Sequence, residues 1–490
     1  MLLPTGTCSG CRARNREIAR LQQQFDEFKR DNARLQRRVS KLKKDNDKLR
    51  AQLDEVQRAA HRQANPFRRE KLKKRKKKPG RKKGHAGDFR PTPTPEQIDR
   101  VVNVPCSMCP DCKVPLVDPG VVVQYQTDLP PIVPIITQFN IETGFCPCCR
   151  QRVQGRHREQ TSDALGAAGN TLGPVVLTMA AEMKHRLGVP YRKICDFLET
   201  YCDFNVCPAT FVRAEQRLAD LARPTYDLLI DALRRAGVVH IDETGWRVSS
   251  RNGWLWVFTN KDVTIYAIRT GKGARGHQVP AEILGPDFDG YIVIDGGKAY
   301  ECLEYTKGQC NAHLLRRAKD MQENASASEK NILQTLITLI QQAMALADLR
   351  GQLTPEKYAQ KVTVLETRLD GWLGDLACRP ENSPELHRFA KHIAKHWDEW
   401  LLFLHEPEVP ATNNLAEQML RPAVITRKVG GCNKTLLGAL THSILSSIMV
   451  TCKQQGQRFL ELARTLWRAG EPKAIPLVPP ETKAAEANVA

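Results

Sequence analysis

The chain has 490 residues, enough for roughly two to four domains with cores of their own. Its hydrophobic content is 41%, and no apolar run approaches the roughly 18 residues that a membrane helix needs, so we expect no membrane span. The N-terminal stretch MLLPTGTCSGCRARNRE has no long apolar core before its charges. This argues against a secretory signal, and we expect a cytoplasmic protein.

The net charge of +20 is unevenly distributed along the chain. Residues 1–100 carry 30 Lys and Arg against 12 Asp and Glu, whereas the remaining residues carry 44 against 42. The positive charge therefore belongs to an N-terminal arm. Such an arm suits a polyanion, most simply DNA or RNA, whose phosphates it neutralises while counterions are released.

Residues 1–64 are predicted to form a coiled-coil dimerisation helix. A seven-residue apolar repeat runs through six heptads, and asparagines at two seam positions favour a fixed register in a parallel dimer. The alternative is a single exposed basic helix. The two seam positions are occupied by Leu21, Phe28, Leu35, Leu42, Leu49 and Val56, and by Ile18, Phe25, Asn32, Val39, Asn46 and Leu53.

Residues 65–100 form a basic segment in which proline and glycine interrupt any helix. Thirteen Lys and Arg fall between positions 68 and 90. The core KPGRKKGHAG, with Lys78, Arg81, Lys82 and Lys83, suits an extended chain in a DNA minor groove. Non-specific attraction to phosphate is the alternative. We therefore predict a flexible DNA-binding linker.

Six cysteines cluster between positions 106 and 149, in VPCSMCPDC and FCPCCRQRVQGRH. Two Cys-x-x-Cys knuckles separated by β-like sequence predict a zinc ribbon over residues 101–160, because four thiolates satisfy tetrahedral zinc. Cys146 and Cys149 form the natural second knuckle. The first is Cys109 with Cys112, or alternatively Cys106 with Cys109; Cys148 and His157 are further candidates.

Residues 161–236 are predicted to be helical. The stretch LGVPYRKICDFLETYCDFNVCPATFVRAEQRLADLA reads as helix, short turn and helix. This is compatible with a DNA-binding helix-turn-helix. Simple helix packing is an equal alternative.

From residue 237 the pattern changes to short β-rich runs. GVVHIDETGWRV, GWLWVFTN and VTIYAIRTG predict a three-stranded meander, and GYIVIDGGKAY predicts a fourth strand. Two apolar strands each deliver an aspartate, Asp242 and Asp295, where ligands bind at the rim of an open sheet. We expect the two carboxylates to converge from adjacent strands, and alternation places Glu243 on the opposite face.

Two converging carboxylates repel each other unless a cation lies between them. Hard oxygen ligands suit Mg²⁺ or Mn²⁺, and a pair of such ions supports in-line phosphoryl transfer. A third acid is then needed. The helix predicted within PATNNLAEQMLRP, residues 410–422, presents Glu417 for this role; a solvated ion pair with Arg421 is the plainer reading of that glutamate.

The assembled pattern resembles the large catalytic protein of the DDE transposases of the insertion-sequence family numbered sixty-six. The resemblance covers nearly the whole chain and rests on PGRKKGHAG, RVQGRHREQTSDALGAA, DETGWRV, DGGKAY, QCNAHLLRRAKD and TNNLAEQMLRPAVITRKVGG. It implies that Asp242, Asp295 and Glu417 are the catalytic acids and hold two Mg²⁺ or Mn²⁺ ions.

The resemblance also implies the fold class, a multidomain α+β protein. Behind the coiled coil, zinc ribbon and helical region, residues 237–470 form a ribonuclease H-like α/β catalytic domain with a helical insertion at about 322–410. A flexible tail follows over residues 471–490. Several basic residues near the acids are candidate DNA contacts, although His313 is as compatible with simple packing at a helix start: His313, Arg316, Arg421, Arg427 and Lys428.

The function expected from these features is DNA transposition. Water attack at an element end frees a 3′-OH, which then attacks target DNA without ATP, because one phosphodiester replaces another. Expected partners are DNA at the element ends and target, a homodimer or higher oligomer through the coiled coil, and accessory proteins of the element, in the cytoplasm at the nucleoid. The alternatives are a DNA-binding regulator with an inactive catalytic fold and a structure-specific nuclease.

Overall fold

The computed structural model describes residues 91–117, 120–169, 171–377 and 383–477, with scattered helical positions between Glu17 and Leu42. The predicted minor-groove segment with Lys78, Arg81, Lys82 and Lys83 lies outside the described residues, as do residues 478–490 of the predicted tail. The chain divides into two units, Met1–Tyr125 and Gln126–Ala490.

In the first unit, the described positions of the predicted coiled coil are helical. Their apolar seam is open to solvent, with Leu21 55%, Phe28 67%, Leu35 60% and Leu42 60% exposed. A helix with such an uncovered stripe needs a partner surface to bury it. Pairing with a second chain stays a prediction.

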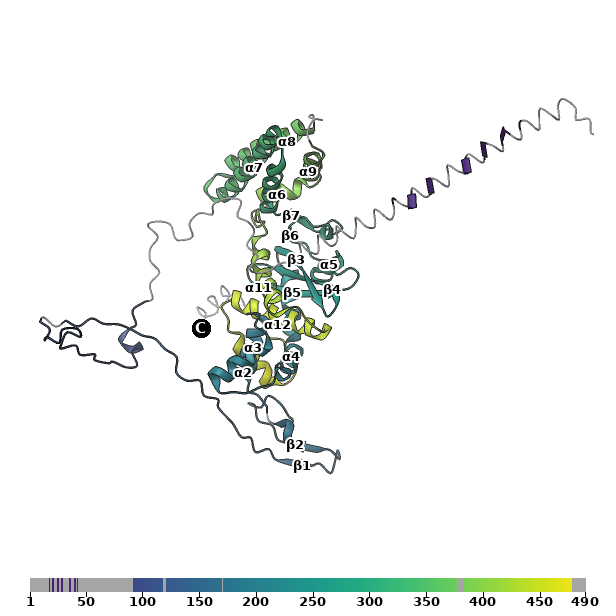
Figure 1. Cartoon of the computed structure of the whole chain (residues 1–490). Coiled ribbons are helices and arrows are strands. Elements are labelled where there is room, and N and C mark those ends of the chain that lie inside the picture. Colours follow the sequence, from purple (N-terminus) through teal and green to yellow (C-terminus); the bar gives the residue numbers. More distant parts are fainter. Residues whose placement is uncertain are drawn as a thin grey trace, which may run out of the picture. The chain divides into compact units, whose positions relative to one another are not determined.

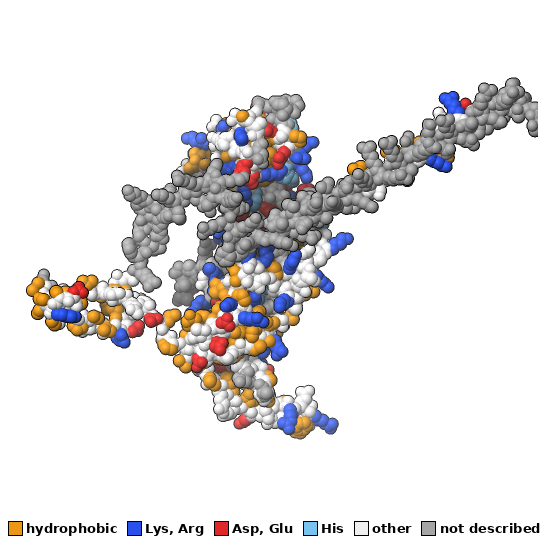
Figure 2. Space-filling view, in the orientation of Figure 1, with side chains coloured by type: hydrophobic (Ala, Val, Ile, Leu, Met, Phe, Trp, Pro, Cys, Tyr) orange, Lys and Arg blue, Asp and Glu red, His pale blue; other side chains and the backbone are white. Residues whose placement is uncertain are grey.

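The first unit also contains a short 3₁₀ helix, η1 (Pro95–Gln97), and a bridge between Met108 and Pro115. Figure 2 shows hydrophobic side chains exposed over this part of the chain. Between residues 120 and 142, where the sequence predicts β structure, the described chain forms no strand. That prediction is wrong because no sheet or core covers the apolar side chains: Val121, Val122, Ile135 and Ile136 are each more than 90% exposed.

The second unit begins with a hairpin of β1 (Thr143–Phe145) and β2 (Arg152–Gln154), followed by η2 (Gly166–Gly169). Three helices then occupy the region predicted to be helical: α2 (Pro174–His185), α3 (Tyr191–Cys202) and α4 (Pro208–Arg234). Proline stands at the first position of α2 and α4. A backbone N–H at that position has no acceptor within the helix, so the absence of an N–H in proline costs no helical hydrogen bond.

A five-stranded sheet lies at the centre of the second unit (Figure 1). Its strands are β3 (Val238–Val248), β4 (Arg251–Thr259), β5 (Thr264–Thr270), β6 (Tyr291–Ile294) and β7 (Thr306–Gln309), in the order β5-β4-β3-β6-β7. The first three strands are antiparallel neighbours, which confirms the predicted meander. β6 pairs in parallel with β3 on its other side, and β7 pairs in parallel with β6. In the chain, α5 (Gln278–Leu284) precedes β6 and η3 (Lys298–Tyr300) precedes β7.

Helix α12 (Leu436–Gln454) lies along the edge strand β5 and satisfies its outward N–H groups with hydroxyls. Four helical residues rise about 6 Å and two strand residues about 6.6 Å, so hydroxyls spaced by four match alternate strand residues. This ladder protects the sheet edge from pairing with another chain. The three bonds are Ile268 N to Ser443 Oγ (3.2 Å), Tyr266 N to Ser447 Oγ (2.8 Å) and Thr264 N to Thr451 Oγ1 (3.0 Å).

Replacing Ser447 with alanine is expected to destabilise the protein by about 1–3 kcal/mol, because the N–H of Tyr266 is left buried without an acceptor. Urea unfolding followed by circular dichroism measures the change. Thr465→Ala is the control, since its exposed hydroxyl only bonds Glu461 O within its own helix. That control is expected to change stability by less than about 0.5 kcal/mol; equal losses in both variants would contradict the role of the ladder.

Among the described residues, α12 is the one helix long and apolar enough to cross a membrane, and 67% of its apolar window is buried inside the protein. It packs in one core with α2, α4, α13 (Phe459–Ala469) and strands β3–β6. The helical region and the sheet therefore share a single hydrophobic core. α12 is a core helix of that body.

The helices between β7 and α11 (Asn414–Gly430) form a second apolar cluster of their own. They gather together in Figure 1 beyond β7, where α10 packs on that strand. Ser326 and Glu329 form a capping box that starts the second of these helices. The helices are α6 (Asn311–Asn324), α7 (Ala327–Asp348), η4 (Arg350–Gln352), α8 (Pro355–Ala377), α9 (Pro384–Lys395) and α10 (Trp397–His405).

Candidate active site

Asp242 and Asp295 lie where two parallel strands separate. The pairing of β3 with β6 ends at His240 and Val293. Asp242 comes two residues later on β3, and Asp295 directly follows the last residue of β6. The sequence predicts Asp242 at a strand end, and this is wrong: β3 continues to Val248 because β4 pairs with it along that length. Asp242 is nevertheless beyond the reach of β6 pairing, so both aspartates leave the β3–β6 pair at the same end.

Glu417 lies near the start of α11, which packs against β3. Its side chain is 37% exposed, and Glu417 Oε1 lies 3.6 Å from His313 Nε2. His313 stands in the first turn of α6 and is 31% exposed. Contact with the Cys310 thiol raises the pKa of His313, although burial lowers it, and the charge of Asp295 adds to the rise. His313 is therefore in contact with Glu417 and within the electrostatic reach of Asp295.

The three carboxylates are close enough to repel one another. Burial raises the pKa of Asp242 to about 7, and the charge of Asp295 is the next largest cause. The charges of Glu243 and Glu417 add to the rise, whereas the Glu243 N–H, 2.7 Å from Asp242 Oδ1, lowers the pKa. A carboxyl whose pKa is raised by three neighbouring acids sits in a field that favours a bound cation.

Two carboxylate oxygens of these acids accept no hydrogen bond within the described protein, although one of them lies 3.6 Å from His313 Nε2. Asp295 Oδ1 and Glu417 Oε1 are both buried and accept no hydrogen bond. Buried polar atoms are rarely left unpaired without a functional reason. In the described ranges, no group of three or more His, Cys, Asp or Glu is placed so that it could hold a metal ion. The donor set, carboxylate oxygens alone, fits Mg²⁺ or Mn²⁺, which keep several water ligands.

The raised pKa of Asp242 predicts a pH-dependent stability effect. Because the folded protein binds this proton more tightly than the unfolded chain, the group favours folding at low pH and loses that contribution as pH rises through about 7. Asp242→Asn is therefore expected to unfold at a higher temperature than the wild type at pH 8 in EDTA, with a smaller difference at pH 5. Calorimetry at both pH values measures this, and a pH-independent difference would contradict it.

Glu243, the neighbour of Asp242, is already engaged on the opposite side of β3. Its side chain is 3% exposed and accepts from Tyr300 Oη (2.5 Å) and Arg275 Nε (3.0 Å). The Arg275 guanidinium lies 4.2 Å from the centre of the Trp254 ring. In the sequence, strand alternation placed Glu243 on the face of β3 opposite to Asp242. It gave no indication that Tyr300 and Arg275 would contact Glu243.

The predicted DNA contacts near the acids differ in their surroundings. Arg316, Arg421 and Lys428 are exposed and free to meet phosphates. Arg427 instead donates to Thr244 Oγ1 (2.9 Å) and to the carbonyl of Gly245 on β3. Its guanidinium joins α11 to the sheet and thereby supports the position of the helix that carries Glu417.

The two predicted zinc knuckles adopt the same local backbone. Cys109 N–H bonds Val114 O, and Cys146 N–H bonds Gln151 O, both at 2.9 Å. In each, the residue after the second cysteine has a left-handed backbone, with φ of 58° at Lys113 and 54° at Arg150. Contact with Cys112 lowers the pKa of Cys109, and contact with Cys149 lowers that of Cys146.

This repetition favours Cys109 with Cys112 over Cys106 with Cys109 as the first knuckle. In each knuckle two thiols lie close together and the pKa of the first is lowered, which fits a cation that needs thiolates. The first knuckle belongs to the first unit and the second to the second unit. The four-cysteine site therefore stays a prediction.

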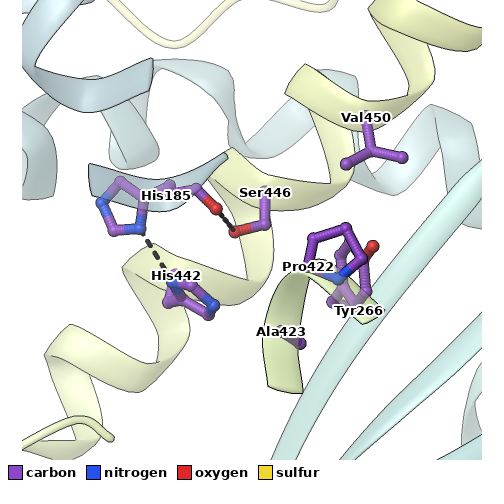
Figure 3. A pocket seen from close by; sticks show the side chains of 7 residues that line it. All are labelled: His185, Tyr266, Pro422, Ala423, His442, Ser446 and Val450. Atoms are coloured by element: carbon purple, nitrogen blue, oxygen red, sulfur yellow. Dashed lines mark hydrogen bonds between the residues drawn. The ribbon is translucent and has the colours of Figure 1, made fainter. Parts of the chain in front are cut away.

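Two hollows lie among the described residues of the second unit. One, of about 230 Å³, lies beside the loop after Asp295, where Lys395 pairs with Glu301 (3.4 Å) and Gln309 donates to Glu399 (2.7 Å). The other, shown in Figure 3, is about 10 Å³, which is room for one water. Beside it His185 Nδ1 lies 2.9 Å from His442 Nδ1, and Ser446 Oγ donates to His185 O. This buried pair joins α2 to α12. The hollow beside it is too small for a ligand larger than water.

Comparison with known proteins identifies relatives of this chain. The family model described as "Transposase IS66 family" matches residues 169–441. Three proteins of Sinorhizobium fredii (strain NBRC 101917 / NGR234) are similar to this chain, and the chain spans about half the length of each. Uncharacterized protein y4qI is 23% identical, over 51% of this chain and 52% of its own length. Uncharacterized protein y4jD is 23% identical, over 49% of this chain and 51% of its own length. Uncharacterized protein y4hP is 21% identical, over 47% of this chain and 47% of its own length.

The family match extends over more than half of the 490 residues and spans the sheet, α6 and α11. It contains Asp242, Asp295, His313 and Glu417. The chain therefore belongs to the transposase IS66 family.

Proposed function

We propose that this protein is a DNA transposase that cleaves the ends of an insertion sequence and joins them to target DNA. The observation that carries the proposal is that the charges of Asp295 and Glu417, 122 residues apart in the chain, both act on Asp242. Burial and the charges of Asp295, Glu243 and Glu417 raise the pKa of Asp242 to about 7. Acids that act on one another in this way support a site for divalent cations that bind phosphodiesters.

We further propose that the sheet is the core of a ribonuclease H-like domain. Three consecutive antiparallel strands followed by two parallel strands, in the order β5-β4-β3-β6-β7, support this. The helices from α6 to α10, with an apolar cluster of their own, support the predicted insertion between the second and third acids.

In the proposed reaction, Asp242, Asp295 and Glu417 hold two Mg²⁺ or Mn²⁺ ions. When bound, these ions supply Lewis-acid stabilisation of both the attacking and the leaving oxygen. The side chain of His313 lies 3.6 Å from Glu417 Oε1, and its raised pKa supports a role in which a protonated ring would donate to a phosphate oxygen. Arg316, Arg421 and Lys428, all exposed, contribute positive charge along the DNA path.

The N-terminal arm is proposed to bind DNA outside the catalytic centre. Its excess of Lys and Arg favours duplex phosphates, the zinc ribbon and helical region would contact element ends, and the coiled coil would bring two copies together. Accessory proteins of the same element are possible partners. The joining step replaces one phosphodiester by another, so no nucleotide cofactor is required.

A gel assay of purified protein tests the proposal. The substrates are labelled duplexes that carry the terminal sequences flanking the gene, with a supercoiled plasmid as target and Mg²⁺ or Mn²⁺ present. Transposition predicts both a cut with a free 3′-OH and a joined product. Cutting without joining would indicate a structure-specific nuclease, and specific binding without cutting would indicate a DNA-binding regulator.

A further inference from the structure

Asn413 stands at the N-cap of α11 but does not cap the helix with its side chain. Asparagine is favoured at this position because its side-chain oxygen ordinarily accepts from an N–H of the first turn. Here the side chain makes no such bond, although the residue is only 1% exposed. The usual reason for asparagine at a helix start is therefore absent.

The side chain of Asn413 instead bridges to strand β3. Its Nδ2 donates to Ile241 O at 2.8 Å, and its Oδ1 lies 2.9 Å from His240 Nδ1. Because Ile241 O can only accept, Nδ2 must face it, and His240 Nδ1 must then carry the proton given to Oδ1. The nitrogen and the oxygen of the amide therefore both bond to the two residues of β3 that directly precede Asp242.

The backbone of Asn413 connects to the other two acids. Its N–H donates to Cys310 Sγ at 3.1 Å, and Cys310 N–H donates to Ile294 O at 2.8 Å, directly before Asp295. Its carbonyl accepts from the N–H of Glu417 at 3.2 Å. Cys310 is fully buried, so this chain of bonds is shielded from water. Asn413 thus bonds directly to the backbone beside Asp242 and to that of Glu417, and through Cys310 to the backbone beside Asp295.

We propose that Asn413 is a positioning residue that sets the spacing of Asp242, Asp295 and Glu417. This inference rests on the proposed function, because the spacing matters only if the three acids hold cations together. Carboxylates that repel one another do not keep a close arrangement by themselves, so a rigid connection must hold them. Residues of this kind, outside the ligand set, commonly change metal affinity by about 10–100-fold when replaced.

The test compares Asn413→Ser with Asn433→Ala in the full-length protein. Serine is a good N-cap residue, so the start of α11 is retained while the bridge to β3 is lost. Asn433 is the matched control. Its Oδ1 accepts from Trp246 Nε1 (2.9 Å) and its Nδ2 donates to Gly438 O (2.9 Å), so it also ties β3 to the chain near α11, but at the far end of the strand.

Binding of Mn²⁺ is measured by electron paramagnetic resonance titration, with thermal unfolding recorded for each variant. Asn413→Ser is expected to bind Mn²⁺ at least about tenfold more weakly than the wild type, and Asn433→Ala within about twofold of it. A folded Asn413→Ser protein with wild-type Mn²⁺ affinity overturns the positioning role alone. A wild-type protein that binds no Mn²⁺ overturns both this role and the proposed function.

A second variant covers the case in which Asn413→Ser does not fold. Cys310→Ala keeps the amide bridge to β3 and removes the sulfur that accepts from Asn413 N–H, together with its contact to His313. A smaller loss of Mn²⁺ affinity in the same direction is expected. Unchanged affinity in Cys310→Ala, together with an unfolded Asn413→Ser, would assign Asn413 to folding and overturn the proposal.

Discussion

Glu417→Gln is expected to reduce DNA cleavage and joining by about 10³-fold or more. The amide keeps the size of the side chain but loses the charge that a divalent cation needs. Stabilisation by such ions contributes several kcal/mol to the transition state, and each 1.4 kcal/mol corresponds to about tenfold in rate. The cleavage rate on labelled element-end duplexes, measured under single-turnover conditions, gives the ratio.

The control for this experiment is Glu461→Gln. Glu461 also lies in the first turn of a helix, α13, and pairs with Arg464 at 3.3 Å on the surface. An exposed pair of this kind contributes little, so cleavage by this variant is expected to equal that of the wild type. If Glu417→Gln retained activity within tenfold of the wild type, Glu417 would not be a cation ligand. The third acid would then have to be sought elsewhere on the chain.

Cys146→Ser is expected to remove the bound zinc from the purified protein and to loosen the β1–β2 hairpin. Structural zinc contributes about 10–16 kcal/mol of apparent binding energy in small domains, and one lost thiolate removes most of it. The zinc content per chain, measured by elemental analysis, should fall from one to near zero. Limited proteolysis should then cut near residues 143–154 faster than in the wild type.

Cysteines of the same cluster provide matched controls for this loss. Cys148→Ser changes the residue between the two cysteines of the second knuckle, and Cys106→Ser tests the alternative first pair. Both are expected to retain one zinc per chain, because the repeated backbone geometry selects Cys109 with Cys112 and Cys146 with Cys149. Loss of zinc in Cys106→Ser with retention in Cys112→Ser would reverse that assignment of the first knuckle.

The two predictions separate the catalytic body from the ribbon. The three acids lie in the second unit, on strands of the sheet or directly after them and on α11, which packs against β3. The cysteines are divided between the first and second units. Loss of the acid at position 417 is therefore expected to stop catalysis while DNA binding persists. Loss of zinc is expected to weaken recognition of the element ends first.

Local sequence patterns determined much about this protein. Three short β-rich runs between positions 238 and 270, with turn signals between them, predicted the antiparallel strands. The two apolar runs before Asp242 and Asp295 predicted adjacent strands, and Pro410, followed by Thr412 or Asn413 as the N-cap, predicted the start of a helix. The heptads and the Cys-x-x-Cys pairs also follow a fixed local spacing, and the coiled coil and zinc site that they indicate stay predictions.

Only the tertiary structure decided how these pieces act on one another. That Asn413 bonds β3 and Cys310 instead of capping its own helix, that Arg427 joins α11 to Gly245, and that Glu243 is taken by Tyr300 depend on contacts between distant residues. The same holds for the hydroxyls of α12 that cover β5. Hydrogen-bond partners far apart in the chain leave no periodic signal, because their spacing follows from packing and not from local backbone geometry.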